Sequence, residues 1–580
     1  MNSRRGGRAR ITMMVVAVFA IVAVFMVRLV DIQIVQAEEL NAASYNKRAV
    51  PMTLYGTRGS IVDAHGNVLA LSVDRFDIVA SPRVALSANS VELNGPAVEA
   101  INQIAAITAS DPAAMLAEFM SDPESDFMYL AQGVTLEVYQ KVRDLDIAWV
   151  DFALRQSRTY PNGAVAGNLT GFIGTDGPQA GLEFSENECL ASNNGTAVYE
   201  KGEDGVHIPG SLVTTDEPVN GGTLHTTIDR DLQWYVQERM AQTYTDVGAT
   251  WVTAVVMRVS DGHLMAVVDY PSVDPNNVDD APRDALGSRA FSWPYEPGST
   301  VKAISAAELL DQGMANQTTP VVAPGRLYLT DGGYIKDSFA HDDTNYTLTG
   351  VLVDSSNTGI SILSREIPAD TRRDYLLDFG LNDTTEVGFM GESEGVVLPT
   401  SDWDERTNLA VQFGQALSVT SVQMASVYQT LANGGVRMPV TLVEGCEQAD
   451  GTMTDVPSTE GRRVISEQAA NDVVEMLEKV VSEGNASYYI PIPGYRIAAK
   501  SGTAEVAVDG VYGDATVISF AGMAPAEDPE YVVVVTAGVP NSDFSSMDMA
   551  TSFRDVIAQT LTHYRVQPST EPAPDIPLTW

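Results

Sequence analysis

Residues 296–302 read Glu-Pro-Gly-Ser-Thr-Val-Lys, and the organisation of the chain follows from this stretch. A Pro-Gly turn runs directly into apolar residues at helical spacing, which places Ser299 in the first turn of a buried helix. Lys302 follows three residues later, so both side chains lie on one helix face. A neutral lysine can take the proton of a serine hydroxyl, and burial or nearby positive charge keeps a lysine neutral. Free backbone N–H groups at the helix start would stabilise an oxyanion.

The Ser-x-x-Lys spacing does not by itself identify a nucleophile. Ser44 and Lys47 have the same spacing, but no Pro-Gly turn precedes them and no apolar helix follows. We therefore expect residues 44–47 to lie on the surface, and the choice of Ser299 depends on other parts of the chain.

A second motif, Ser355-Ser-Asn357, follows the helix of Ser299. Its hydroxyl can relay a proton and its amide can both donate and accept hydrogen bonds. An ordinary turn or helix cap would have the same composition, so the motif alone is weak evidence.

A third motif, Lys500-Ser501-Gly502-Thr503, lies in a β-rich stretch. Its glycine lets a ligand approach the strand closely, and its cation and hydroxyls suit a carboxylate. Taken alone, this motif would be read as an exposed turn.

Composition limits the possible functions. The 580 residues are too many for one core, and the net charge of −41 argues against nucleic acid as a partner. The six histidines form no His-Glu-x-x-His pattern, and two cysteines cannot form a four-cysteine zinc site, so we expect no metal. Cys189 and Cys446 lie far apart in sequence and in different predicted domains, and we expect both to be free and structural.

The N-terminus predicts a membrane anchor. Four arginines precede an uncharged, mostly apolar run at residues 11–27. The positive flank predicts a cytoplasmic N-terminus, with the bulk of the chain outside the cell. A cleaved signal peptide is the alternative, but the run is longer than a usual signal sequence and charges precede the possible cleavage site.

The remaining chain divides into two large regions and a tail. Residues 55–70 predict two short strands around a turn, and residues 91–145 look helical. Strands are expected at 251–259, 263–270, 495–504, 516–523 and 531–539, with helices between them and a last helix at 546–564. This order predicts one sheet built from both ends of the domain, with the helical middle covering it and forming a second lobe.

The three motifs occur in the order Ser-x-x-Lys, Ser-x-Asn, Lys-Ser-Gly, which resembles the penicillin-binding proteins and class A β-lactamases. The match extends to Arg-Gly-Ser-Ile-Val-Asp at 58–63, Gly-Leu-Glu at 181–183 and Phe-Gly-Gln at 413–415. The chain therefore resembles a class B penicillin-binding protein, a monofunctional peptidoglycan D,D-transpeptidase. Between residues 358 and 414 there is no Glu-x-x-x-Asn of the kind that a class A β-lactamase uses, which favours a transpeptidase.

The resemblance implies an α/β (α+β) penicillin-binding transpeptidase fold, with an antiparallel five-stranded sheet covered by helices and an all-helical lobe. The expected domains are a cytoplasmic tail (1–10), a transmembrane anchor (11–30), an elongated pedestal or dimerisation-like domain (31–220), the transpeptidase domain (221–566) and a disordered tail (567–580).

The resemblance also implies a role for each motif. Ser299 would attack a D-Ala-D-Ala peptide, Lys302 would act as base, and backbone N–H groups of Ser299 and Thr503 would hold the oxyanion. Ser355 would relay a proton to the departing D-alanine, and Asn357 would hold the amide of the donor peptide. Lys500, Ser501 and Thr503, with Gly502 between them, would bind the terminal carboxylate. No cofactor is implied.

The sequence departs from the family pattern at Ser501, where threonine is commoner, and at Glu505, where many relatives carry glutamine. Serine keeps the hydroxyl, whereas Glu505 could alter the local charge.

The implied substrates are lipid II-derived stem peptides, the implied inhibitors are β-lactams, and the implied partners are a membrane-embedded peptidoglycan glycosyltransferase and other divisome proteins. A division-type enzyme is favoured by the chain length and by the lack of a C-terminal repeat. The alternatives are an elongation-type enzyme, a D,D-carboxypeptidase with the same catalytic residues, and a non-catalytic scaffold or β-lactam sensor.

Overall fold

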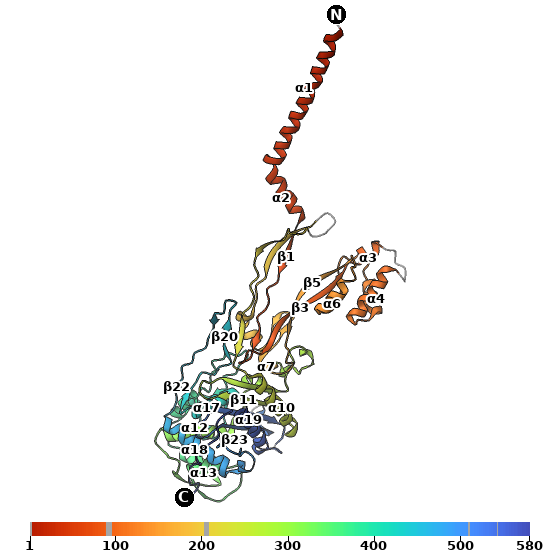
Figure 1. The fold of residues 1–580 in the computed structure, drawn as a ribbon. Coiled ribbons are helices and arrows are strands. Elements are labelled where there is room, and N and C mark those ends of the chain that lie inside the picture. The colour runs from red at the N-terminus through yellow and green to blue at the C-terminus, as the bar shows by residue number, and fades with distance from the viewer. Residues whose placement is uncertain (1–2, 89–94, 202–207, 509–510, 542) are drawn as a thin grey trace. The chain divides into compact units, whose positions relative to one another are not determined.

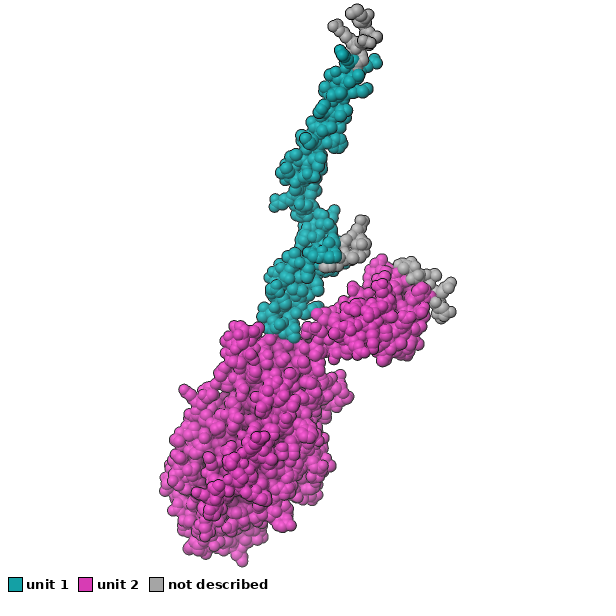
Figure 2. Space-filling model, viewed as in Figure 1, with its two compact units in different colours: residues 1–57, 192–220 teal, residues 58–191, 221–580 magenta. Residues whose placement is uncertain are grey.

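The computed structural model describes residues 3–88, 95–201, 208–508, 511–541 and 543–580. The chain forms two compact units, residues 1–57 with 192–220 and residues 58–191 with 221–580 (Figure 2). In its described residues, the first unit contains the α-helices α1 (Ser3–Val30) and α2 (Ala37–Arg48), joined by a π-helical turn at Asp31–Val35. It also contains a three-stranded sheet in the order β1 (Ala49–Leu54), β8 (Gly195–Glu200), β9 (Val213–Asp216). Ser44 and Lys47 are exposed on α2, as predicted.

The N-terminal helix contains the apolar run that predicted the anchor. Among the described residues, one stretch is helical, long and apolar enough to cross a membrane, residues Arg8–Val35. Its apolar side chains are not buried against other parts of the protein, as expected for a helix that contacts lipid. This helix fits a single-pass membrane anchor.

The second unit begins with a mixed region of strands and short helices. β2 (Ile61–Val62) and β3 (Val68–Ala80) flank the turn predicted at residues 65–67. The predicted helical stretch contains α4 (Pro96–Thr108), α5 (Pro112–Phe119) and α6 (Leu136–Arg143), but β4 (Met128–Val134) interrupts it and pairs with β3. Residues 91–94 of that prediction lie outside the described residues.

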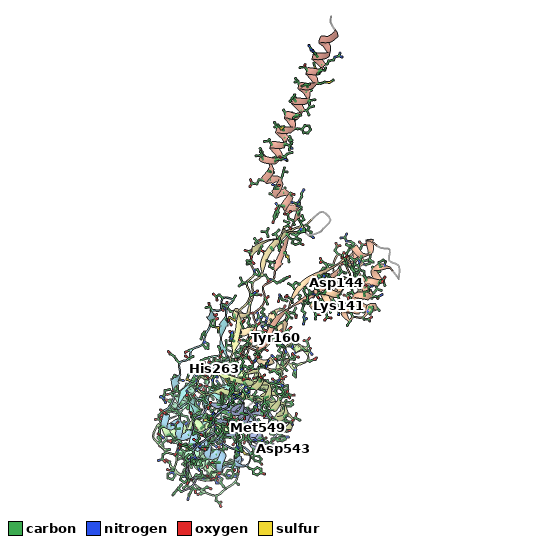
Figure 3. The ribbon with its side chains drawn as sticks, viewed as in Figure 1. Lys141, Asp144, Tyr160, His263, Asp543 and Met549 are labelled. Atoms are coloured by element: carbon green, nitrogen blue, oxygen red, sulfur yellow. A yellow bond between two sulfur atoms is a disulfide. The ribbon has the colours of Figure 1, made fainter. Side chains whose placement is uncertain are left out.

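A buried ion pair holds this region together. Glu183 is fully buried and accepts from Arg58 Nε at 2.7 Å and Arg158 Nε at 2.6 Å. Tyr160, labelled in Figure 3, donates its hydroxyl to the same carboxylate at 3.2 Å. The motif at 58–63 and the Gly-Leu-Glu motif therefore meet in one structural cluster, where the pairing offsets the desolvation of each charge.

The five-stranded sheet has the predicted antiparallel architecture. Its strand order is β12 (Leu264–Tyr270), β11 (Trp251–Arg258), β25 (Tyr531–Val539), β24 (Val511–Ala524), β23 (Ala498–Val508). The first two strands precede the helical middle of the domain and the last three follow it, so the sheet is assembled from both ends as predicted. β23, which carries the Lys-Ser-Gly motif, is an edge strand and can pair with an added peptide.

Both faces of the sheet are covered, which explains the continuous apolar run in β11. Val252, Ala254 and Val256 pack with α10 (Arg230–Asp246) and α19 (Ala550–His563). Val255 and Met257 point to the opposite side, where α17 (Ser421–Ala432) and α18 (Glu467–Glu483) complete a second core (Figure 1). Period-two alternation distributes one strand between two cores, so neither face needs polar residues.

The lobe is not all-helical. Besides its helices, it contains three short antiparallel pairs: β13 (Pro320–Ala323) with β16 (Thr344–Thr347), β14 (Arg326–Tyr328) with β15 (Tyr334–Lys336), and β17 (Val396–Val397) with β18 (Leu417–Ser418). These strands are two to four residues long, too short for sequence periodicity to reveal them.

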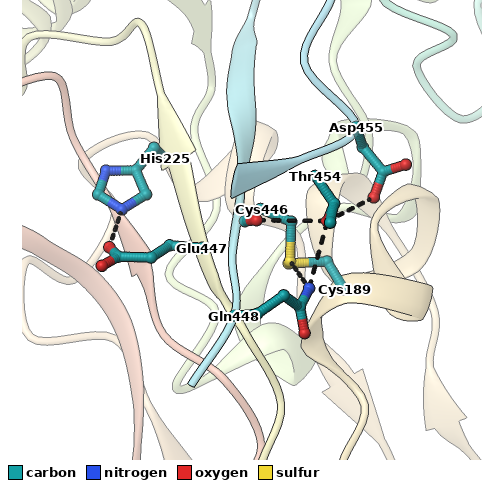
Figure 4. The surroundings of a disulfide bond; sticks show 7 residues. All are labelled: Cys189, His225, Cys446, Glu447, Gln448, Thr454 and Asp455. Atoms are coloured by element: carbon teal, nitrogen blue, oxygen red, sulfur yellow. Dashed lines mark hydrogen bonds and ion pairs between the residues drawn. A yellow bond between two sulfur atoms is a disulfide. The ribbon is translucent and has the colours of Figure 1, made fainter. Parts of the chain in front are cut away.

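The prediction of free cysteines is wrong. Cys189 and Cys446 form a disulfide, and Figure 4 shows it beside the pair that His225 makes with Glu447. The two cysteines are 257 positions apart in sequence, so nothing local signals their pairing. Both belong to the second compact unit, where β10 (Thr223–Thr226) pairs with β20 (Val443–Glu447) and brings the two sequence regions together.

The C-terminal segment also differs from the expected disorder. Thr347 donates its backbone N–H to Leu578 O at 2.9 Å and its hydroxyl to Pro577 O at 2.7 Å. Ile576 is buried, and Thr579 bridges to Tyr346 as an additional strand residue. The high proline content prevents a helix in this segment but does not prevent it from packing as an extended strand.

Candidate active site

The nucleophile candidate Ser299 lies in a tight helical turn at the start of α12 (Lys302–Asp311), next to β23. The 3₁₀ turn Gly298–Val301 continues into α12, close to the predicted geometry. Gly298 has φ +56°, and a Cβ at this position would come within 2.8 Å of Thr503 O. The turn therefore packs against the backbone of β23, and only glycine permits that approach.

Lys302 connects the first two motifs. Its Nζ lies 3.1 Å from Ser299 Oγ and 3.2 Å from Ser355 Oγ. It also lies 2.5 Å from Ser355 O and 2.6 Å from Asn357 Oδ1. The lysine is fully buried, so these four oxygens form its polar environment.

These contacts suit a neutral amine. The two shorter contacts join Nζ to carbonyl oxygens, which can only accept, and a neutral amine has two hydrogens to donate. Its lone pair then remains for the proton of Ser299. Burial first, and the charge of Lys500 second, hold the pKa of Lys302 well below its usual range, while the carboxylate of Asp337 opposes them. The contacts are compatible with a neutral Lys302, and the lowered pKa favours that form, which a general base requires.

The second motif lies in the turn between α13 (Leu348–Val353) and α14 (Asn357–Leu363). Ser355 has φ +57°, a left-handed conformation that costs a non-glycine residue free energy. This conformation directs both its carbonyl oxygen and its hydroxyl toward Lys302. The surrounding contacts must hold the turn in place.

Asp337, which the sequence analysis missed, supplies several of those contacts. Its side chain is fully buried and accepts from Ser356 Oγ at 2.7 Å and from the backbone N–H of Thr358 at 2.9 Å. Asn357 N donates to it at 2.5 Å, and His341 Nε2 lies 2.9 Å from it. A carboxylate at these N–H groups caps the start of α14 and fixes the orientation of the second motif.

No sequence signal distinguishes Asp337. The chain has 76 acidic residues, and Asp337 follows a three-residue strand at no regular spacing from either neighbouring motif. Its proximity to the second motif follows only from the fold.

The third motif lies on β23. Lys500 is fully buried, and its Nζ donates to Ser355 Oγ at 3.0 Å and to Ser501 O at 3.1 Å. Burial lowers the pKa of Lys500 to about 7. A Cβ on Gly502 would lie 2.7 Å from Pro297 O, so this glycine lets β23 approach the turn before Ser299. The three motifs therefore meet at Ser355, which contacts a lysine from each of the other two.

The predicted site residues surround one cleft of about 480 Å³. Its lining includes Ser299, Ser355, Asn357, Ser501 and Thr503, while Lys302 and Lys500 are buried beneath and contact the lining hydroxyls. Further lining residues that the sequence analysis did not assign are Phe339, Gln415, Asn485, Phe544 and Met547. Met549, at the start of the last helix, belongs to the core behind them (Figure 3).

Family comparisons agree with this geometry. Residues 252–558 match the family described as penicillin binding protein transpeptidase domain. Residues 53–226 match the penicillin-binding protein dimerisation domain.

Individual relatives are similar over most of the chain. The penicillin-binding protein PbpB of Mycolicibacterium smegmatis is 32% identical over 598 residues, covering 97% of this chain and 91% of the relative. The peptidoglycan D,D-transpeptidase FtsI of Escherichia coli is 30% identical over 488 residues, covering 84% of this chain and 80% of the relative.

Solved structures match as well. A peptidoglycan synthetase from Bifidobacterium adolescentis superposes with a TM-score of 0.72 at 29% identity, over 92% of this chain and 100% of that one. Penicillin-binding protein 3 of Mycobacterium tuberculosis, complexed with aztreonam, gives 0.70 at 28% identity, over 91% of this chain and 100% of that one.

Proposed function

This chain belongs to the class B penicillin-binding proteins, the division-type peptidoglycan D,D-transpeptidases, and we propose that Ser299 is the nucleophile of its D-Ala-D-Ala transpeptidase reaction. The observation that carries the assignment is the 3.1 Å contact between Ser299 Oγ and Lys302 Nζ, whose two shortest contacts are to acceptor oxygens. Members of the family bind peptidoglycan stem peptides and β-lactams, and both are substrates for the same serine.

The reaction proceeds in two acyl transfers. Ser299 Oγ attacks the carbonyl carbon of the D-Ala-D-Ala bond and gives its proton to Lys302 Nζ. Backbone N–H groups of Ser299 and Thr503 hold the oxyanion. The C–N bond then breaks, the proton passes through Ser355 Oγ to the departing amine, and D-alanine leaves. An acceptor amine attacks the acyl carbon and gives a proton to Lys302. Lys302 returns this proton to Ser299 Oγ as the ester C–O bond breaks, which completes the cross-link and restores the free serine.

Lys500 links substrate binding to activation. A substrate carboxylate at Lys500, Ser501 and Thr503 favours the charged form of Lys500, whose pKa burial lowers to about 7. That charge disfavours a proton on Lys302, the other lysine at Ser355 Oγ. Binding of the correct substrate thus increases the fraction of Lys302 that can act as base. Asn357 holds the amide of the donor peptide, and Gly502 keeps the strand close to Ser299.

The test of this assignment is covalent labelling. Incubation of the full-length protein with benzylpenicillin is expected to give a one-to-one adduct, and peptide mass spectrometry places it on Ser299. Ser299→Ala is expected to give no adduct, whereas Ser44→Ala, which removes the exposed serine with the same spacing to a lysine, labels normally. An adduct on another residue, or none, would overturn the assignment.

We propose further that the N-terminus is cytoplasmic, that the catalytic unit lies outside the membrane, and that the anchor and the region after it bind a membrane-embedded glycosyltransferase of the divisome. The arginines in the first turns of α1, which precede its apolar run, support the orientation. The disulfide supports it too, because disulfides persist in oxidising compartments. Replacing residues 11–30 with an unrelated apolar helix is expected to abolish co-purification of the glycosyltransferase. Retained co-purification would rule out the anchor as its binding surface.

A further inference from the structure

A second cavity of about 430 Å³ opens near one end of the five-stranded sheet. Its lining includes three aromatic side chains, with Trp251 and Trp293 set edge to face at 6.4 Å and Tyr295 beside them. Trp293 is 40% exposed. Glu505, the residue at which the sequence departs from the family pattern, lines the same cavity and is itself exposed.

The cavity adjoins the active-site cleft. Thr516 of β24 lines both spaces, and it pairs across the sheet with Glu505 of β23. Strand side chains alternate, so Ser501, Thr503 and Glu505 lie on one face of β23. Glu505 therefore stands about 7 Å beyond Thr503 along the same strand face, by the usual rise per residue.

Two polar groups in this cavity point to a ligand. Thr516 Oγ1 is buried and has no hydrogen-bond partner within the described part of the chain, although buried hydroxyls are normally paired. The carboxylate of Glu505 provides negative charge at the rim. Aromatic faces attract cations, and the Arg289 guanidinium, 4.7 Å from the centre of the Trp293 ring, already uses that attraction. A carboxylate, an unpaired hydroxyl and indole walls together suit a protonated amine on an aliphatic chain.

The donor peptide passes this point. Its terminal carboxylate lies at Lys500 and Ser501 and its reacting carbonyl at Thr503, so the residues before D-Ala-D-Ala continue toward Glu505. A peptide added to the free edge of β23 follows this direction. Because one stem peptide's amine resolves another's acyl-enzyme, each stem peptide carries a side-chain amine. The donor's own amine is then the cationic group nearest to this cavity.

We propose that the cavity lined by Trp251, Trp293, Glu505 and Thr516 is a binding subsite for the side-chain ammonium of the donor stem peptide, and that Glu505 makes the enzyme prefer donors whose amine is free. The inference rests on the proposed function, because it uses the direction of the donor along β23. The methylene groups lie on the indole rings, and the ammonium donates to the Glu505 carboxylate and Thr516 Oγ1.

Two peptides that differ only in the amine test this subsite. Nα-acetyl-Lys-D-Ala-D-Ala keeps the ammonium, and Nα,Nε-diacetyl-Lys-D-Ala-D-Ala lacks it. The measurement is the peptide concentration that halves the rate at which benzylpenicillin acylates Ser299 in the full-length protein. We expect the free-amine peptide to act at about three- to fivefold lower concentration, the effect of a partly exposed ion pair.

The variant Glu505→Gln is expected to remove this difference by weakening only the free-amine peptide. Glu505→Lys should reverse the preference. Glu460→Gln makes the same change in net charge at an exposed residue that lines neither cavity, so it should leave the preference intact.

The outcomes separate the two proposals. Equal protection by both peptides in the unmodified protein, or a preference that survives in Glu505→Gln, would overturn the subsite while the labelling of Ser299 stands. A failure of benzylpenicillin to label Ser299 would instead overturn the assigned nucleophile. A preference lost equally in Glu460→Gln would show a general effect of the protein's charge and would also overturn the subsite.

Discussion

Lys302→Ala is expected to lower the rate constant for acylation of Ser299 by benzylpenicillin about a thousandfold, within the range of general-base catalysis. The change removes the only group shown within 3.1 Å of Ser299 Oγ that can accept its proton among the described residues. It also empties a fully buried position among four oxygens. Quenched-flow mass spectrometry of the adduct gives the rate constant directly.

Lys302→Arg serves as the charge control. Arginine cannot lose its proton in a protein, so it should not restore acylation although it keeps a donor at this position. Thermal unfolding of each variant establishes that the domain remains folded. Acylation by Lys302→Arg at more than about a tenth of the normal rate would exclude Lys302 as the base, given the expected size of the effect.

The assignment of Lys302 as general base also predicts how the acylation rate depends on pH. Acylation should increase as pH rises through the pKa of Lys302, because only the neutral amine accepts the proton. The pKa of Lys302 is lowered mainly by burial and secondly by the charge of Lys500. The variant Lys500→Ala keeps the burial of Lys302 but removes that charge. The pKa of Lys302 then increases, and the rising limb of the profile moves to higher pH. A limb at unchanged pH would show that Lys500 does not keep Lys302 neutral.

The parts of the site that could be predicted from the residues alone are those whose members lie close together in the sequence. Ser299 and Lys302 are three residues apart on one helical turn, so their proximity follows from helix geometry. β25 was located at its observed bounds because nine consecutive apolar or small residues mark a strand buried on both faces. The positions of Ser355 and Lys500 beside Ser299 and Lys302 were inferred from the order of the three motifs in a known family. Sequence spacing alone does not predict the distance between segments so far apart in the chain.

Long-range contacts without a family motif could not be predicted. The disulfide depends on how β10 and β20 pair. The packing of the C-terminal segment depends on the β-bridge between Thr579 and Tyr346. Asp337 belongs to the same class, because its partners at 356–358 are close in space but are separated from it in the chain by β16 and α13. These contacts are set by tertiary packing, which composition and periodicity do not encode.

Asp337→Ala is expected to lower acylation of Ser299 about a hundredfold, although Asp337 does not contact the serine. The change removes the carboxylate that accepts from the first two N–H groups of α14, those of Asn357 and Thr358, although the Ser356 cap remains; losing such a partner costs about 1–3 kcal/mol for a buried group. The strained turn at Ser355 then loses its restraint, and the oxygens that keep Lys302 in position move away. The acylation rate constant and hydrogen exchange at residues 355–359 measure the two effects.

The matched control is Asp343→Ala, the same substitution at an exposed aspartate in the loop that follows Asp337. It should change neither measurement. If Asp337→Ala increased hydrogen exchange at 355–359 but left acylation unchanged, the orientation of Ser355 would not matter for activating Ser299. If Asp337→Ala increased acylation below neutral pH without increased exchange, its effect would instead be electrostatic, because Asp337 favours the charged form of Lys302 and its loss would lower that pKa further. A more neutral Lys302 would accelerate acylation at low pH, so the sign of the change below neutral pH distinguishes orientation of the motif from charge.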